Sequence, residues 1–109
     1  MTSPDSNHRP KKPERPQACD LCGRAVPLTF HHLVPRGVHR RPRFVRRYGK
    51  DEMRAVGLWI CRLCHSGIHE IIPNEKELAE SYYTKELLLG HEGIARHVAW
   101  VSKQKNRRR

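Results

Sequence analysis

This sequence has few hydrophobic and aromatic residues, and it has no long apolar run. Of its 109 residues only 37% are hydrophobic and 6% aromatic, so we expect one small domain with a small core. No apolar stretch approaches the roughly 20 residues that a membrane-spanning helix needs, so we expect no membrane partner. The first residues carry charge without an apolar stretch, so we expect no secretory signal and a cytoplasmic location.

Acidic residues are also scarce, and this leaves a large positive charge. The chain has 22 Lys and Arg against 11 Asp and Glu, for a formal net charge of +11 at pH 7. Such an excess most often indicates an acidic polymer as partner, with nucleic acid as the leading candidate. Residues 36–50 contain no acidic residue and read as a basic loop, either a solvated one or one that contacts phosphates. The candidate nucleic-acid-binding residues are Arg36, Arg40, Arg41, Arg43, Arg46, Arg47 and Lys50.

The four cysteines form two Cys-x-x-Cys pairs, Cys19 with Cys22 and Cys61 with Cys64. In a reducing compartment, pairs at this spacing usually bind a metal, although free thiols or a redox pair are alternatives. Two thiolates on one tight turn can reach a Zn²⁺ ion at about 2.3 Å, and a second turn completes the tetrahedron. Gly23 suits the first turn because glycine tolerates unusual backbone angles. We therefore predict a structural zinc site, which would supply folding free energy of order 10 kcal/mol.

The pattern of apolar residues and chain breakers predicts two strands between polar ends. The proline-rich residues 1–17 predict a disordered basic arm, and residues 103–109 predict a basic tail. Partly alternating apolar residues over 24–34, and an apolar run over 55–60, predict strands. The folded domain is therefore expected to span residues 18–102.

The region after the second cysteine pair is predicted to be helical. A first helix follows the pair directly and carries the next two histidines. Asn74 and Thr84 are suitable N-cap residues for helices over 74–82 and 84–89. Residues 92–104 form an amphipathic segment with the apolar stripe Ile94, Val98 and Val101.

Four of the eight histidines lie in two clusters beside the cysteine pairs. His65 and His69 are four residues apart on the predicted helix, so they share a face and can bind one metal ion. His31 and His32 are neighbours on the predicted strand and should point to opposite faces. One of these two can then bind the metal while the other faces water or substrate. These four histidines predict a second metal site, and the alternative is that they are structural histidines. We expect the other four histidines to face solvent, namely His8, His39, His91 and His97.

The combination of these motifs resembles the zinc-containing branch of the HNH endonucleases, whose fold is the ββα-metal unit. The resemblance covers about residues 19–72, through the cysteine pairs and the segments Leu28-Thr-Phe-His-His-Leu-Val-Pro35 and Ile60-Cys-Arg-Leu-Cys-His-Ser-Gly-Ile-His69. Residues 77–101 are similar to the helical tail of small bacterial members.

This resemblance implies a role for each histidine of the two clusters. His31, His65 and His69 would bind the catalytic metal, and His32 would be the general base that activates water. The structural zinc ligands would be Cys19, Cys22, Cys61 and Cys64. The family usually has Asn in the strand before the second cysteine pair, where this chain reads Val56-Gly57-Leu58. The polar group that braces the loop carrying the base is therefore missing or comes from elsewhere.

The chemistry also follows from the residue types. A neutral imidazole can accept a proton from water, and a divalent ion held by two or three imidazoles keeps positions open for phosphate oxygen and water. Imidazole ligands favour Zn²⁺, Ni²⁺ or Mn²⁺, and Mg²⁺ with water ligands is also compatible. Cleavage of a phosphodiester needs both groups, because water must be activated and the phosphate charge relieved.

We therefore expect an α+β protein, a small zinc-stapled and treble-clef-like ββα-metal unit with C-terminal helices. The expected function is that of a metal-dependent DNA endonuclease, which hydrolyses or nicks double-stranded DNA with little sequence preference. The alternative is a non-catalytic zinc-binding module that grips nucleic acid. A third interpretation, a zinc-stabilised adaptor for proteins, leaves the histidine clusters and the charge unused.

Overall fold

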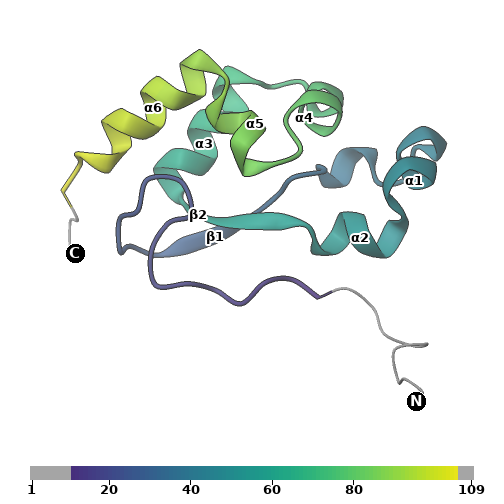
Figure 1. Cartoon of the computed structure of the whole chain (residues 1–109), viewed down its shortest axis with the longest axis horizontal. Coiled ribbons are helices and arrows are strands. Elements are labelled where there is room, and N and C mark those ends of the chain that lie inside the picture. The colour runs from purple at the N-terminus through teal and green to yellow at the C-terminus, as the bar shows by residue number, and fades with distance from the viewer. Residues whose placement is uncertain (1–10, 106–109) are drawn as a thin grey trace.

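A computed structural model describes residues 11–105, which form a two-stranded sheet and a set of short helices (Figure 1). In chain order the elements are β1 (Leu28–His32), the 3-10 helix η2 (Arg36–Val38), α1 (Pro42–Tyr48), α2 (Lys50–Ala55), β2 (Gly57–Cys61), α3 (Arg62–Ile71), α4 (Glu75–Ser81), α5 (Lys85–Leu89) and α6 (Glu92–Ser102). The fold is thus mixed α+β, as predicted. None of the helices in this part of the chain is long and apolar enough to cross a membrane.

The two strands are antiparallel and lead directly into α3. Leu28 lies opposite Cys61, and His32 lies opposite Gly57 at the other end of the pair. Because β2 ends at Cys61 and α3 begins at the next residue, the second cysteine pair spans the junction between strand and helix. Helix α3 packs on both strands and on α6, so it joins the sheet to the C-terminal helices. Figure 1 shows α3, α5 and α6 on one side of the strands.

The caps predicted for the C-terminal helices are confirmed. The side-chain oxygen of Asn74 accepts the N–H groups of Lys76 and Glu77 at 2.9 and 3.2 Å. The Thr84 hydroxyl accepts the Leu87 N–H at 3.0 Å. Each oxygen satisfies N–H groups that the first helical turn leaves without a partner. The predicted stripe of α6 is also buried, in a core cluster that contains Ile94, Val98 and Val101.

The prediction of a loop over residues 36–50 is wrong, because this segment holds η2, α1 and the start of α2. Pro42 occupies the first turn of α1, where its fixed φ is favourable. Phe44 of α1 and Met53 of α2 are fully buried in a second, smaller core cluster. Gly49, with a φ of 86°, separates the two helices. The buried apolar residues of this segment are few and widely spaced among the arginines, so the sequence shows no clear helical periodicity here.

The ends of the described chain have no regular structure. Residues 11–17, which belong to the predicted arm, contain no helix or strand, and they contact the sheet. Residues 1–10 of the predicted arm, with His8, and residues 106–109 of the predicted tail lie outside the described residues. The histidines expected in solvent are half-buried and hydrogen-bonded where they are described, namely His39, His91 and His97.

Candidate metal centres and basic cavity

The two cysteine pairs meet at the junction of β2 and α3. The four sulfur atoms of Cys19, Cys22, Cys61 and Cys64 all lie within 4.8 Å of one another. The Sγ atoms of Cys22 and Cys61 are 3.7 Å apart. Four sulfurs around a Zn²⁺ ion at about 2.3 Å would be roughly 3.8 Å apart, so this cluster could bind zinc.

The backbone around this cluster favours a thiolate. The Sγ of Cys19 accepts N–H groups from Leu21, Cys22 and Cys61 at 3.3–3.4 Å. The pKa of Cys19 is lowered to about 4, with a hydrogen bond from Cys64 as the largest cause and these N–H groups among the others. The Arg24 guanidinium lies 3.6 Å from the Cys61 sulfur. Zinc binds thiolates rather than thiols, so these donors suit the metal state.

A second cluster forms between β1 and α3, where the predicted metal-binding histidines come together. One nitrogen from each of His31, His65 and His69 lies within 4.8 Å of the others. Helical spacing brings the rings of His65 and His69 to 5.0 Å, and the inward face of β1 carries His31 to 5.2 Å from His65. His31 is buried and His69 is exposed, so this cluster, called here the His triad, opens to solvent on one side.

The buried member of the His triad has no hydrogen-bond partner. His31 is 1% exposed, and neither of its ring nitrogens has a partner among the described residues. An unsatisfied buried polar group costs about 1–3 kcal/mol, and a metal ion bound to the lone pair of one ring nitrogen would remove the share of that cost that belongs to this nitrogen. Burial is also the largest cause that lowers the pKa of His31 to about 3, so the ring is neutral and can act as a ligand.

The hydroxyl group of Thr29 fixes the orientation of His65, the second member of the His triad. The Thr29 hydroxyl donates to the Ile60 carbonyl oxygen at 3.2 Å, and its oxygen lies 2.7 Å from Nδ1 of His65. Since the single hydroxyl hydrogen points to the carbonyl, Nδ1 of His65 is the donor in the shorter bond. The Nε2 lone pair of His65 is therefore free for a metal ion. Such outer partners fix the tautomer of a metal-binding histidine.

His32 points to the opposite face of β1 from His31, as the alternation of strand residues predicts. It faces a cavity of about 930 Å³. The other residues that line the cavity are Lys12, Arg36, Gly37, His39, Arg40, Lys50 and Arg54. None of the three triad histidines is among them, so His32 alone of the four predicted histidines reaches this cavity. The lining holds five basic side chains and no acidic one.

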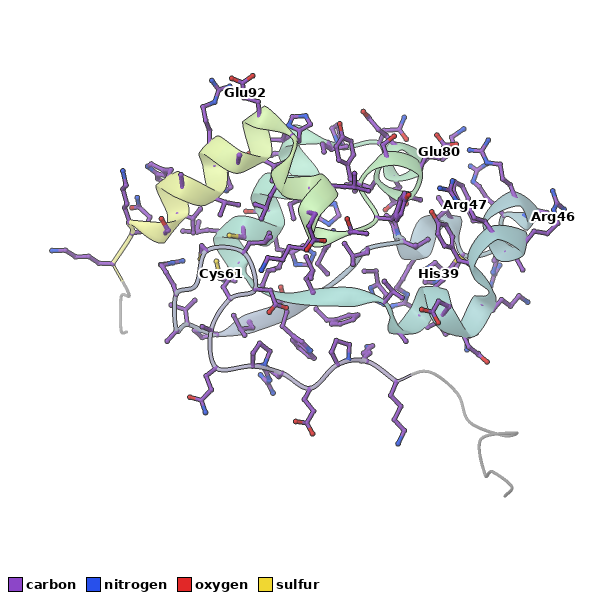
Figure 2. All side chains as sticks on the ribbon, viewed as in Figure 1. His39, Arg46, Arg47, Cys61, Glu80 and Glu92 are labelled. Atoms are coloured by element: carbon purple, nitrogen blue, oxygen red, sulfur yellow. The ribbon has the colours of Figure 1, made fainter. Side chains whose placement is uncertain are left out.

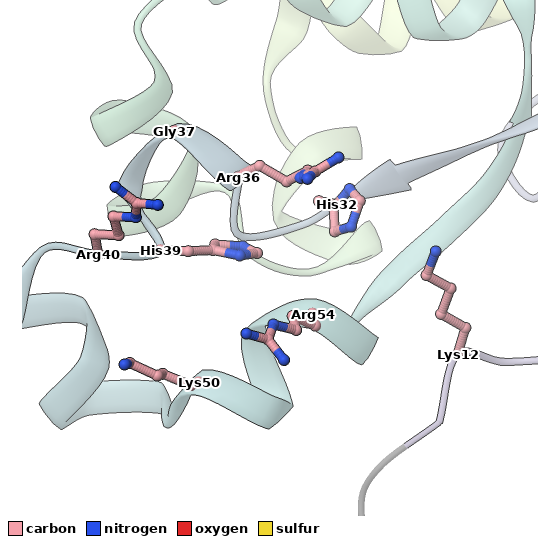
Figure 3. Close-up of a pocket in the computed structure, with 8 residues that line it drawn as sticks. All are labelled: Lys12, His32, Arg36, Gly37, His39, Arg40, Lys50 and Arg54. Carbon is pink, nitrogen blue, oxygen red and sulfur yellow. The ribbon is translucent and has the colours of Figure 1, made fainter.

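Figure 3 shows how separate parts of the chain supply these charges. Lys12 reaches in from the N-terminal segment, Lys50 and Arg54 come from α2, and the remaining basic residues come from the connection between β1 and α1. Burial, followed by the charges of His39, Lys12 and Arg36, lowers the pKa of His32 to about 4. His32 is therefore neutral at pH 7 and can accept a proton.

Only some of the predicted phosphate-binding residues line the cavity. Arg36, Arg40 and Lys50 line the cavity, whereas the four arginines between them do not. Lys12 and Arg54 also line the cavity, although the sequence analysis did not single them out. The four arginines away from the cavity lie on or beside α1, and they are Arg41, Arg43, Arg46 and Arg47. Figure 2 shows Arg46 at the edge of the molecule.

Two of the arginines on α1 have other contacts. Arg43 pairs with Glu80 of α4. The Arg47 guanidinium lies 5.1 Å from the ring centre of Tyr48 and 5.2 Å from that of Tyr83. These contacts tie α1 to the C-terminal part of the chain, so we assign both arginines a structural contribution.

His39 is a site residue that the sequence analysis missed. Its Nε2 atom lies 2.6 Å from the Val34 carbonyl oxygen, and its ring centre is 5.8 Å from that of His32. Because a carbonyl can only accept, Nε2 of His39 carries the proton. The Leu33 N–H also donates to the Val56 carbonyl oxygen at 3.1 Å. These two bonds brace the chain just after His32, and no local pattern around His39 indicates this.

Gly57 occupies the place where the sequence analysis noted the missing polar residue. A Cβ atom there would collide with the Phe30 ring and the His31 carbonyl oxygen. The Phe30 ring instead packs edge-on against His32, with ring centres 5.1 Å apart. An asparagine side chain therefore does not fit opposite His32, and the hydrogen bond from His39 to the Val34 carbonyl oxygen braces the loop instead.

No protein-family model, no curated protein and no solved structure gives a significant match to this chain.

Proposed function

We propose that this protein is a metal-dependent DNA endonuclease of the HNH type, built on a zinc-stapled, treble-clef-like ββα-metal unit. In this proposal His31, His65 and His69 hold a divalent ion, and His32 is the general base. Cys19, Cys22, Cys61 and Cys64 hold a structural zinc ion. The resemblance of the two motif segments to that family supports these roles, and so does the convergence of the three histidines.

The single observation that carries the proposal is the unsatisfied His31 side chain inside the His triad. Its two nitrogens lack partners although the ring is 1% exposed, and two further imidazoles lie beside it. A structural histidine would normally be hydrogen-bonded at this depth. A divalent ion bound to one of these nitrogens would give that nitrogen a partner, and it would polarise a phosphoryl oxygen and offset the charge of the phosphate.

The basic cavity supports the choice of a phosphodiester as substrate. Its five cations can hold phosphate oxygens, and its lining contains no acidic side chain. A phosphate held near Lys12 and Arg36 would offset the charges that lower the pKa of His32, and the pKa would rise toward its ordinary value. Substrate binding would thus make His32 a stronger base for an incoming water molecule.

The test is cleavage of supercoiled plasmid by the purified protein with Mg²⁺, Mn²⁺ or Ni²⁺. We expect nicked product that EDTA suppresses, and we expect His32→Ala to abolish cleavage without loss of plasmid binding. His91→Asn is a matched control, because Asn can also cap α6 and the site is not involved. Binding without cleavage under all three ions would overturn the proposal.

A second candidate function is that of a zinc-binding module that binds nucleic acid without cleaving it. The observation that favours it is the separation of the basic cavity from the His triad, since none of the triad residues lines that cavity. This candidate predicts the same steep salt dependence of binding, because several phosphate contacts release counterions. It predicts no cleavage with any ion and no change in binding when His31 is replaced by Leu.

A further inference from the structure

The segment before the first cysteine pair follows the sheet instead of leaving it. Nε1 of Trp59 donates to the Pro13 carbonyl oxygen at 2.7 Å. The Arg15 guanidinium lies 5.4 Å from the Trp59 ring centre, and Nζ of Lys12 lies 4.9 Å from the Phe30 ring centre. Phe30 and Trp59 are paired across the two strands and face the same side of the sheet. Residues 12–15 therefore lie on the sheet face that carries His32, and Figure 1 shows this segment on the side away from α3.

This path ends at the basic cavity. Lys12 lines the cavity together with His32 and Arg36, although it is far from both in the sequence. The next residue along the chain, Pro13, is the one that Trp59 holds. The contact between Trp59 and Pro13 thus determines where the Lys12 side chain can reach. Figure 3 shows Lys12 facing the cavity from the side opposite Arg40.

We propose that Lys12 contacts the phosphate backbone of the DNA substrate and that Trp59 is a positioning residue that holds Lys12 at the cavity. This inference rests on the proposed function, because it takes the occupant of the cavity to be a nucleic-acid phosphate. Residues 12–15 form no strand or helix, and one hydrogen bond with two cation–π contacts is a weak attachment. A phosphate bound by Lys12 adds a contact, so substrate binding and docking of the segment reinforce each other.

The experiment measures binding of a fluorescently labelled DNA duplex to the zinc-loaded full chain by anisotropy, without added divalent ion. Lys12→Gln should weaken binding roughly fivefold and lower the magnitude of the salt slope by about 0.9, the loss expected for one phosphate contact. Lys11→Gln removes the same charge from the neighbouring exposed position, which does not line the cavity. It should leave the salt slope unchanged.

Trp59→Phe keeps an aromatic ring on the sheet and removes the N–H donor together with part of the indole ring. It should weaken binding about threefold in the native chain and have no effect in the Lys12→Gln background, because Trp59 acts through Lys12. A purely structural role would give the same loss in both backgrounds and would refute the positioning role. Equal effects of Lys11→Gln and Lys12→Gln would refute the direct contact.

Failure of the two proposals can be told apart. If the native chain does not cut plasmid but Lys12 and Trp59 remain coupled in binding, the nuclease proposal fails and the inference about the segment stands. If the plasmid is cut while Lys12→Gln binds like the native chain, the inference fails and the nuclease proposal stands. A native chain that does not bind the duplex contradicts both.

Discussion

Replacing Thr29 by Val tests the His triad without touching any of its members. The substitution removes the hydroxyl that accepts Nδ1–H of His65 at 2.7 Å and keeps a β-branched side chain on the strand. Valine suits a strand as well as threonine does, so the stability of the fold should change little. The expected loss is therefore confined to the orientation and tautomer of the His65 ring.

The magnitude follows from the position of Thr29. Loss of an outer partner of a metal-binding histidine typically lowers metal affinity about 10- to 100-fold. Thr29 is exposed, so water can replace its hydroxyl in part, and we expect a loss near the lower limit, roughly tenfold. Thr29→Ser is the matched control, because it keeps the hydroxyl and should bind metal as the native chain does.

The assay is calorimetric titration of Ni²⁺ into protein whose cysteine cluster already holds zinc. A weaker Ni²⁺ affinity in Thr29→Val, with native affinity in Thr29→Ser, would support the assigned tautomer of His65. Equal Ni²⁺ affinities in all three proteins would refute the role of Thr29. An equal loss in both variants would show that strand packing, and not the hydroxyl, sets the affinity.

Three further substitutions test the fold and the loop that carries His32. Cys64→Ser should abolish tight zinc binding and cooperative thermal unfolding, because this buried thiol belongs to the metal cluster. A variant that circular dichroism shows to be stably folded would contradict the stabilisation of the fold by zinc. Asn74→Ala should lower the free energy of unfolding by about 1 kcal/mol, measured by urea denaturation, and no change would contradict the cap. His39→Phe should lower plasmid cleavage roughly tenfold without changing the zinc content, because the hydrogen bond to the Val34 carbonyl oxygen is lost. Cleavage at the native rate in this variant would exclude a bracing role for His39.

Much of the fold could be predicted because its signals are local. Cysteine spacing predicted the cluster, and the caps at Asn74 and Thr84 predicted the starts of two helices. The four-residue spacing of His65 and His69 predicted that they share a helix face, since helical geometry alone decides it.

The remaining features depend on contacts between distant residues. Helices α1 and α2 form because Phe44 and Met53 are buried in one cluster, and neither residue forms a strong periodic pattern among its charged neighbours. Trp100 is 53% exposed, because the buried stripe of α6 passes beside it. Trp59 is half-buried on the face that meets the N-terminal segment.

The most direct test of the central claim is a crystal structure of the protein soaked with Mn²⁺, with anomalous data collected for manganese. We expect a manganese peak bonded to nitrogens of His31, His65 and His69, separate from a zinc position among the four cysteines. Anomalous maps that show manganese only elsewhere, with the His31 ring still unpartnered, would refute the assignment of the His triad as a metal site.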